Sequence, residues 1–126
     1  MTAKPKTSVH FTNTDFANCT PPSSINDMSQ STLNKLDAVR VHLGRKPIIT
    51  SAFRSPEHDR SRGRSGTGAH TTGRAVDIGC ITSTDRMRVV EAGLKAGFRR
   101  IGIAATFIHL DDSPTHAQNV IWLYND

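Results

Sequence analysis

His70-Thr-Thr-Gly-Arg-Ala-Val-Asp77 is the stretch that decides the fold, because it sets an imidazole and a carboxylate seven positions apart with a glycine between them. Positions seven apart face opposite sides of a continuous strand, and the threonines, Gly73 and Val76 disfavour a helix. We therefore expect His70 at the end of a loop, a turn of the chain at Gly73, and Asp77 on the strand that follows. On its own the pair is weak evidence for a metal site, since a hydrogen-bonded pair in a loop also explains it.

A second imidazole follows in Phe107-Ile-His109-Leu-Asp111, at the end of a predicted strand. His109 changes the balance because it supplies a third ligand from a separate strand. Two histidines and one carboxylate are the ligand types of an open catalytic zinc site, in which water takes the fourth position. Asp111 shares a strand face with His109, so it is a fourth ligand, a group that orients an imidazole, or a turn residue before Pro114.

The size and composition of the chain indicate a single domain over residues 1–126, with residues 1–8 as a loose N-terminal tail. A hydrophobic fraction of 36% predicts a small core with much of the chain in loops. No apolar run approaches the roughly 20 residues that span a bilayer, so we expect no membrane span. The N-terminus lacks the apolar core of a signal peptide, so we expect the protein to be cytoplasmic as synthesised or to leave by a route that needs no signal.

The net charge of +5 is compatible with nucleic acid, an anionic membrane surface or an anionic polymer such as the bacterial cell wall. A nucleic-acid binder is one hypothesis, motivated by the basic residues Arg54, Arg60, Arg62, Arg64 and Arg74. Acidic residues interrupt this run and aromatics for base stacking are absent from it, so we expect no nucleic-acid partner. Two widely separated cysteines make no disulfide framework, and we interpret them as reduced structural thiols.

Hydrophobic periodicity predicts an α+β fold, with two helices packed on a mainly antiparallel sheet. The helices are expected at 29–43 and 84–96, and the strands at 48–53, 74–78, 98–104, 106–110 and 119–124. Expected inward-facing residues are Leu33, Leu36, Val39 and Leu43 on the first helix, Met87, Val90 and Leu94 on the second, and Ile121 and Trp122 on the last strand. Residues 60–68 are rich in Gly, Ser and Arg and are expected to form a long loop.

Three blocks of the sequence together resemble the zinc D-alanyl-D-alanine carboxypeptidase family over about residues 9–124. They are Ile49-Thr-Ser-Ala-Phe-Arg54-Ser-Pro-Glu-His58, Gly68-Ala-His70-Thr-Thr-Gly-Arg-Ala-Val-Asp77-Ile and Phe107-Ile-His109-Leu-Asp111. The resemblance implies the fold of the hedgehog signalling domain and the murein endopeptidases. It implies zinc bound by His70, Asp77 and His109. It also implies substrate binding by Arg54, to which we add Ser51 from the same block, and hydrolysis of peptide bonds in bacterial peptidoglycan.

The sequence departs from this family at the general base. Catalytic members of the fold often place a Glu, Asp or His a few residues before the third ligand, where Ile103-Ala-Ala-Thr106-Phe-Ile offers neither a carboxylate nor an imidazole. The remaining candidates are Asp111, Glu57, His58 and His116. Asp111 ranks first as a catalytic residue because it shares a strand face with a ligand, although a role in orienting that ligand is favoured slightly over base catalysis.

The leading hypothesis is a zinc-dependent peptidase, a carboxypeptidase or endopeptidase, that acts as a monomer on peptidoglycan stem peptides. The missing signal peptide fits an endolysin of the phage type, which is made in the cytoplasm and reaches the cell wall at lysis. The alternative is a non-catalytic zinc-binding recognition module of the same fold, which the empty base position supports.

Overall fold

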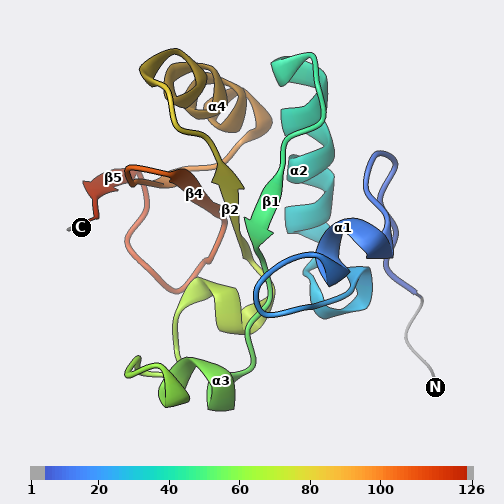
Figure 1. Ribbon diagram of the computed structural model, residues 1–126, viewed down its shortest axis with the longest axis vertical. Coiled ribbons are helices and arrows are strands. Elements are labelled where there is room, and N and C mark those ends of the chain that lie inside the picture. The colour runs from blue at the N-terminus through green and yellow to red at the C-terminus, as the bar shows by residue number, and fades with distance from the viewer. Residues whose placement is uncertain (1–4, 125–126) are drawn as a thin grey trace.

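A computed structural model of the chain describes residues 5–124 (Figure 1). The elements follow in the order α1 Asn13–Ala17, η1 Ile25–Asp27, α2 Gln30–Leu43, β1 Ile49–Ser51, α3 Pro56–Ser61, η2 Ala69–Thr72, β2 Ala75–Gly79, α4 Ser83–Ala96, β3 Arg100–Ile103, β4 Phe107–Asp111 and β5 Val120–Leu123, where η marks a 3₁₀ helix. None of the helices within residues 5–124 is long and apolar enough to cross a bilayer.

The five strands form one sheet in the order β1-β2-β4-β3-β5. The pairings β1–β2, β2–β4 and β3–β4 are antiparallel, and β3–β5 is parallel. The predicted α+β class is confirmed, with a sheet that is mixed because the last strand runs along β3 in the same direction. All five predicted strands and both predicted long helices are present, and α1 is a short helix that the sequence analysis did not predict.

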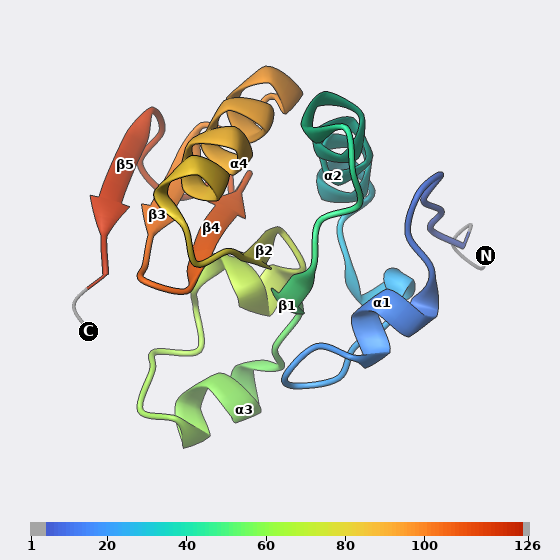
Figure 2. The same cartoon turned by 45° about the horizontal axis from the view of Figure 1, so that its top comes forward.

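One face of the sheet is covered by the two long helices, α2 and α4, which lie side by side over it (Figure 2). Ile78, Ile108 and Leu110 are fully or almost fully buried on this face. Side chains alternate between the faces of a strand, so Asp77 and His109 must lie on the opposite face. The helices therefore hold the core on one side of the sheet and leave the other side available for polar chemistry.

Helix α2 packs as its apolar spacing predicts, with Leu33, Leu36 and Val39 completely buried. It begins after Ser29 and ends at Gly44, whose left-handed backbone (φ 79°) is the conformation that favours glycine at a helix C-terminus. These capping signals are local, which is why the sequence alone located both ends of the helix.

Helix α4 is rotated from the expected orientation, so the prediction that Met87 and Leu94 face inward is wrong. Met87 is 66% exposed, and the buried residues of α4 are Val89, Ala92 and Gly93. A Cβ atom on Gly93 would lie 2.7 Å from the Leu110 side chain. The bare backbone of Gly93 thus allows the helix to approach β4 closely.

Ile121 is a second correction, because it is 58% exposed and does not anchor β5 in the core. The strand lies at the edge of the sheet, beyond most of the area that α4 covers (Figure 2). Trp122, the other expected anchor, points to the opposite face from Ile121 and is half-buried there.

The N-terminal segment is tied to α2 and the loop before it. The backbone amides of Lys6 and Thr7 donate to the side chains of Asn26 and Gln30. Ser8 Oγ donates to Asp37, which also accepts from two following backbone amides. Residues 1–4 of the expected tail lie outside the described residues.

A buried carboxylate joins α2 to the end of β4. Asp112 accepts hydrogen bonds from Ser31 Oγ at 2.8 Å and Thr32 Oγ1 at 2.5 Å, and it pairs with Lys35 Nζ at 3.0 Å. Arg74 Nη1 lies 3.9 Å away, so the carboxylate also reaches the start of β2. These contacts bridge segments about 80 positions apart and hold α2 across the sheet.

Asp112→Asn should destabilise the fold by about 1–3 kcal/mol, because the neutral amide loses the charge-assisted hydrogen bonds while keeping the shape of the side chain. Urea unfolding of the metal-free protein measures the change in the free energy of unfolding. The matched control is Glu91→Gln on the exposed side of α4, expected within about 0.5 kcal/mol of wild type. Equal stabilities for the two variants would contradict the assignment.

Candidate metal centre

His70 lies in the short helix η2, which ends where Gly73 adopts a left-handed backbone (φ 70°). A Cβ atom at Gly73 would lie 2.2 Å from the carbonyl oxygen of Asp27, so only glycine fits this turn. The carbonyl of Gly73 accepts from the amide of Ser29, which fixes the turn against the start of α2. The chain then enters β2 and brings Asp77 back toward His70.

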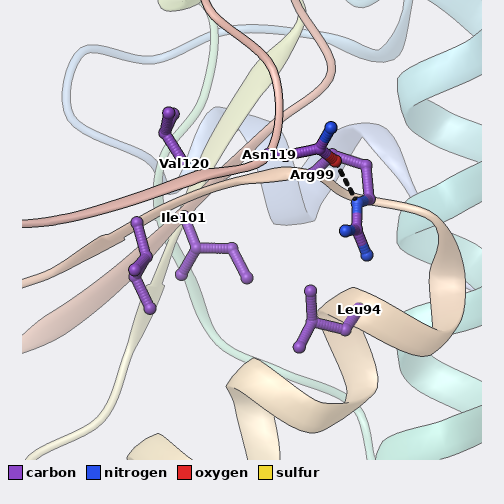
Figure 3. Close-up of a pocket in the computed structure, with 6 residues that line it drawn as sticks. Leu94, Arg99, Ile101, Asn119 and Val120 are labelled. Atoms are coloured by element: carbon purple, nitrogen blue, oxygen red, sulfur yellow. Dashed lines mark hydrogen bonds between the residues drawn. The ribbon is translucent and has the colours of Figure 1, made fainter.

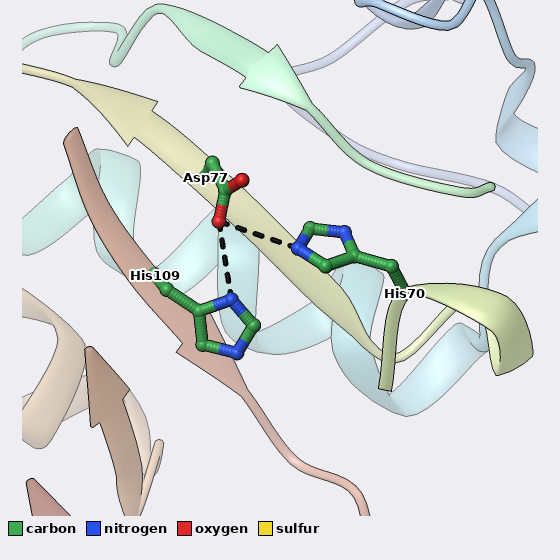
Figure 4. Close-up of side chains that lie close together, drawn as sticks. All are labelled: His70, Asp77 and His109. Carbon is green, nitrogen blue, oxygen red and sulfur yellow. Dashed lines mark hydrogen bonds and ion pairs between the residues drawn. The ribbon is translucent and has the colours of Figure 1, made fainter. Parts of the chain in front are cut away.

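Asp77 and His109 are direct cross-strand partners on β2 and β4, and so their side chains share a face. Asp77 Oδ1 lies 3.1 Å from His109 Nδ1 and 3.3 Å from His70 Nε2 (Figure 4). The three residues are buried, and one potential ligand atom from each lies within 4.8 Å of the others. The structure thus brings together the three residues that the sequence analysis assigned to a metal.

The outer nitrogen of each imidazole has its own acceptor. His70 Nδ1 lies 2.5 Å from the carbonyl oxygen of Ala52, which can only accept, so Nδ1 carries a proton; Nε2 faces Asp77 and has the lone pair for a metal when the ring is neutral. His109 Nε2 lies 2.5 Å from the acceptor Asp111 Oδ2, so Nε2 carries a proton and Nδ1 is the nitrogen that faces Asp77 and has the lone pair for a metal when the ring is neutral. Metal-binding histidines in proteins are commonly oriented in this way, by a carbonyl or carboxylate on the second nitrogen.

The electrostatics of the cluster favour an ionised Asp77. Burial raises the pKa of this carboxyl group, but hydrogen bonds from His109 and His70 outweigh burial and hold the pKa well below its usual range. Burial lowers the pKa of His109, and the adjoining carboxylates of Asp111 and Asp77 outweigh it and raise that pKa. The carboxylate is therefore available as an anionic ligand at neutral pH.

Asp111 is fully engaged on the side of His109 remote from Asp77. It is 1% exposed and accepts from His109 Nε2, from Arg100 Nε at 2.7 Å and from the amide of Ser113 at 3.1 Å. Burial raises the pKa of the Asp111 carboxyl group, but the hydrogen bonds and the charge of Arg100 outweigh burial, and the pKa is lowered overall. The group sits where it can orient His109.

Arg54 and Ser51, the two predicted substrate contacts, both carry buried polar atoms that lack a hydrogen-bond partner within residues 5–124. These atoms are Arg54 Nε and Ser51 Oγ. Buried polar atoms almost always have a hydrogen bond, so two without one beside the cluster suit groups that a ligand completes, although Arg54 Nε also lies 3.7 Å from the Asp59 carboxylate. The amide of Arg54 donates to the carbonyl of His70, which places this arginine next to a predicted ligand.

An irregularity in β1 accounts for the position of Ser51. Ile49 pairs with Ile78, and uninterrupted antiparallel pairing would then set Ser51 opposite Val76, on the helix-covered face. The register instead shifts by one residue and sets Ser51 opposite Asp77. A bulge of this kind re-aims the following side chains, and here it turns the segment that leads to Arg54 toward the metal-ligand candidates.

Asp59 is a residue of the site that the sequence analysis did not identify. Its side chain is 3% exposed and pairs with Arg54 Nε at 3.7 Å and Arg64 Nη1 at 4.0 Å. It also accepts from the amide of Gly66, which ties the 62–67 loop to α3. The sequence shows that Asp59 is one of two acidic residues in a basic stretch, but it does not show that the side chain is buried.

Two aromatic residues, Trp122 and Tyr124, are also close to the cluster and were not assigned to it from the sequence. The centroids of their rings lie 5.3 and 6.4 Å from that of His109. The two residues lie two positions apart on the same side of the chain, and Trp122 is the cross-strand partner of Gly102. An isolated glycine within a strand often marks a close approach by another group, so Gly102 is the sequence signal that could have located them.

The other candidates for the general base, Glu57, His58 and His116, do not share the contacts that Asp111 makes with a ligand candidate. The Glu57 side chain is 79% exposed and pairs with Arg60, and His116 Nδ1 contacts Ser113 Oγ at 2.7 Å. The His58 side chain makes no hydrogen bond among the described residues. Thr106 belongs to the segment 103–108, where a base was expected from the family resemblance, and it is exposed before β4.

A pocket of about 200 Å³ lies on the helix side of the sheet, between α4 and β5 (Figure 3). It is lined by Leu94, Arg99, Ile101, Asn119, Val120 and Ile121, and Arg99 Nε donates to Asn119 Oδ1 at 2.8 Å. None of the predicted site residues lines it. The sheet separates this pocket from His109, so it is distinct from the metal-ligand cluster.

The cysteines are not part of the site. Cys19 and Cys80 are both free and buried. Burial is the main reason that the pKa of Cys19 is raised to about 11, so its thiol is neither a ligand nor a nucleophile at neutral pH.

The donor set at the cluster fits zinc. It combines two imidazole nitrogens and one carboxylate oxygen, with the remaining nitrogens already occupied by outer acceptors. Three protein ligands leave room for water, which is the arrangement of catalytic rather than structural zinc sites.

A family model described as Peptidase M15 matches residues 8–111. No curated protein matches the chain. The matched region contains all six residues predicted for the site and ends at Asp111, the last residue of β4, so that β5 lies beyond it.

Proposed function

The chain belongs to the peptidase M15 family, the zinc metallopeptidases of D-alanyl-D-alanine carboxypeptidase type, and from this membership we propose that it hydrolyses peptide bonds in the stem peptides of bacterial peptidoglycan. The observation that carries the proposal is the geometry of His70, Asp77 and His109, three buried ligand types within 4.8 Å of one another. The family match and the ligand cluster both support a zinc peptidase.

We propose that His70 Nε2, a carboxylate oxygen of Asp77 and His109 Nδ1 hold the zinc. The chemistry that zinc supplies in such a site is an activated water molecule and Lewis-acid polarisation of the scissile carbonyl. The chain contributes the orientation of the ligands, through the Ala52 carbonyl behind His70 and the Asp111 carboxylate behind His109. Asp111 is in this scheme a positioning residue, because it acts through His109.

Arg54 supplies the positive charge for the substrate. Burial and the neighbouring Arg64 lower the pKa of its guanidinium, while Asp77, Asp59 and Tyr124 raise it, so the charged group is held among acceptors beside the cluster. A planar guanidinium fork suits a carboxylate or a developing oxyanion. With Ser51 on the same face, it forms the substrate-binding part of the proposed site.

All of these groups come from one chain and gather around one sheet. We therefore propose that residues 1–126 act as a single catalytic domain and that the site is complete in a monomer. A peptide lying across the sheet would meet Ser51 and Arg54 on the β1 side of the cluster.

A second candidate function is a non-catalytic zinc-binding module that recognises peptidoglycan. The observation in its favour is the state of the candidate bases, since Asp111 is committed to three hydrogen bonds and Glu57 is exposed and paired with Arg60. Such a module would retain zinc and bind the stem peptide without cleaving it.

One assay tests the proposed function. Purified protein incubated with peptidoglycan should release peptide or amino-acid fragments that mass spectrometry identifies, and a chelator should abolish the release. His70→Ala should contain less than one-tenth of the wild-type zinc and release nothing, because two ligands cannot hold the ion. Wild-type protein that binds zinc and peptidoglycan but releases no fragment would establish the recognition module instead.

Arg54→Ala should keep its zinc and lower kcat/KM by about 10²-fold or more, since it removes the charge that binds the substrate or stabilises the oxyanion. Steady-state hydrolysis and metal analysis measure the two quantities. Arg64→Ala is the matched control, because Arg64 also approaches Asp59 but is largely exposed, and its kcat/KM should stay within about twofold of wild type. Equal kinetics for Arg54→Ala and wild type would remove Arg54 from the site.

Asp111→Asn should weaken zinc binding by roughly 10–100-fold while leaving the rate at saturating zinc within a few-fold of wild type, as expected for a group that orients a ligand. Zinc titration and hydrolysis at saturating zinc separate the two effects. Asp112→Asn, one position along with its side chain bonded to α2, should bind zinc normally. A rate that stays down by about 10²–10⁴-fold at saturating zinc would instead identify Asp111 as the general base.

A further inference from the structure

The last strand and the residue that follows it place an aromatic pair, Trp122 and Tyr124, beside the metal-ligand candidates. One row of cross-strand partners runs through the whole sheet: Ser51 opposite Asp77, Asp77 opposite His109, His109 opposite Gly102, and Gly102 opposite Trp122. Cross-strand partners share a face, so Trp122 lies on the face of the cluster. Tyr124 is two positions further along the same side, and its amide continues the pairing with β3 by donating to the carbonyl of Ile103.

Gly102 allows both rings to lie across β3. A Cβ atom at this position would lie 2.6 Å from Tyr124 Cε2 and 2.7 Å from Trp122 Nε1. Any other residue would displace the rings, so the bare backbone of Gly102 is what brings them next to His109.

The pair is held in place from both sides. The Arg100 guanidinium stacks 5.1 Å from the centre of the Trp122 ring, and the same guanidinium donates to Asp111. The Phe107 ring packs 5.2 Å from that of Tyr124. Tyr124 nevertheless remains 38% exposed, so the side chain is positioned by packing and accessible to a ligand.

Tyr124 also lies within electrostatic reach of the substrate-binding side of the site. Burial is the main cause that raises the pKa of its hydroxyl, Trp122 lowers it, and the charges of Asp77 and Arg54 act on it in opposite directions. Geometry places both residues beside the cluster, because the Tyr124 ring centroid lies 6.4 Å from that of His109 and the Arg54 amide donates to the carbonyl of His70. A phenol with an ordinary pKa near 10 is a hydrogen-bond donor at neutral pH.

We infer that Tyr124 is a substrate-contacting residue of this site, whose hydroxyl donates a hydrogen bond to the carbonyl oxygen of the peptide bond, and that Trp122 positions it over Gly102. The inference rests on the proposed peptidase function and extends it to β5, a strand beyond the family match. Arg54 and Tyr124 then provide a charged and a neutral donor to the same substrate.

The test is Tyr124→Phe, which keeps the ring and removes only the hydroxyl. On the substrate identified with peptidoglycan, kcat/KM should fall by about 10²–10³-fold, the usual effect of losing one donor to an oxyanion, with zinc content unchanged. A phosphinate dipeptide with the two residues that flank the cleaved bond should bind about 10- to 100-fold more weakly. Binding can be followed by the fluorescence of Trp122, the single tryptophan of the chain, and by calorimetry.

Two further variants distinguish the hydroxyl from the strand that carries it. Leu123→Ala alters a residue of β5 that is 76% exposed and faces away from the cluster, and it should leave hydrolysis and phosphinate binding unchanged. Gly102→Ala retains the hydroxyl but displaces the rings, so it should reduce both quantities as Tyr124→Phe does.

Wild-type kinetics and phosphinate affinity in Tyr124→Phe would overturn the inference and leave the proposed function standing. Wild-type protein that cleaves no peptidoglycan bond would overturn the proposed function and this inference with it.

Discussion

The buried carboxylate of Asp77 is the group on which the rest of the site depends. An ionised carboxylate is costly to bury unless charges or hydrogen bonds compensate it, and here two imidazoles do so at the same oxygen, Oδ1. Each imidazole is in turn held by an acceptor on its outer nitrogen, the Ala52 carbonyl or Asp111. The result is a chain of hydrogen bonds across the sheet in which each ligand candidate is oriented before a metal arrives.

The sheet makes this arrangement compatible with a stable fold because its two faces are used for different purposes. Ile78, Ile108 and Leu110 pack beneath the helices, and their strand neighbours Asp77 and His109 carry polar groups on the other face. Gly93 of α4 brings the helix close enough to fill the core without a large side chain. The small chain can thus contain a buried polar cluster and still form a core, since its apolar residues are concentrated on the helix-covered face of the sheet.

The register of the strands determines which residues meet. Pairing across the sheet brings together Ser51, Asp77, His109, Gly102 and Trp122, which the sequence scatters over about 70 positions. The two ends of this row differ in chemistry, with the hydroxyl of Ser51 at the β1 end and aromatic rings at the β5 end. A peptide has both polar backbone groups and side chains to be recognised, so a site built between such ends suits it.

The sequence by itself determined the fold class, both long helices, all five strands and the three residues of the His-Asp-His cluster. It could do so because strand alternation, helix capping and the spacing around Gly73 are local signals, and because the three motif blocks resemble a family that residues 8–111 are now shown to match. Only the tertiary structure decided that Met87 and Ile121 are exposed, that a register shift turns Ser51 toward Asp77, and that Asp111 sits behind His109. It also decided that Trp122 and Tyr124 reach the cluster across Gly102. These features depend on how closely elements approach and on the pairing between distant strands, and the physical contacts that set both do not exist until the chain has folded.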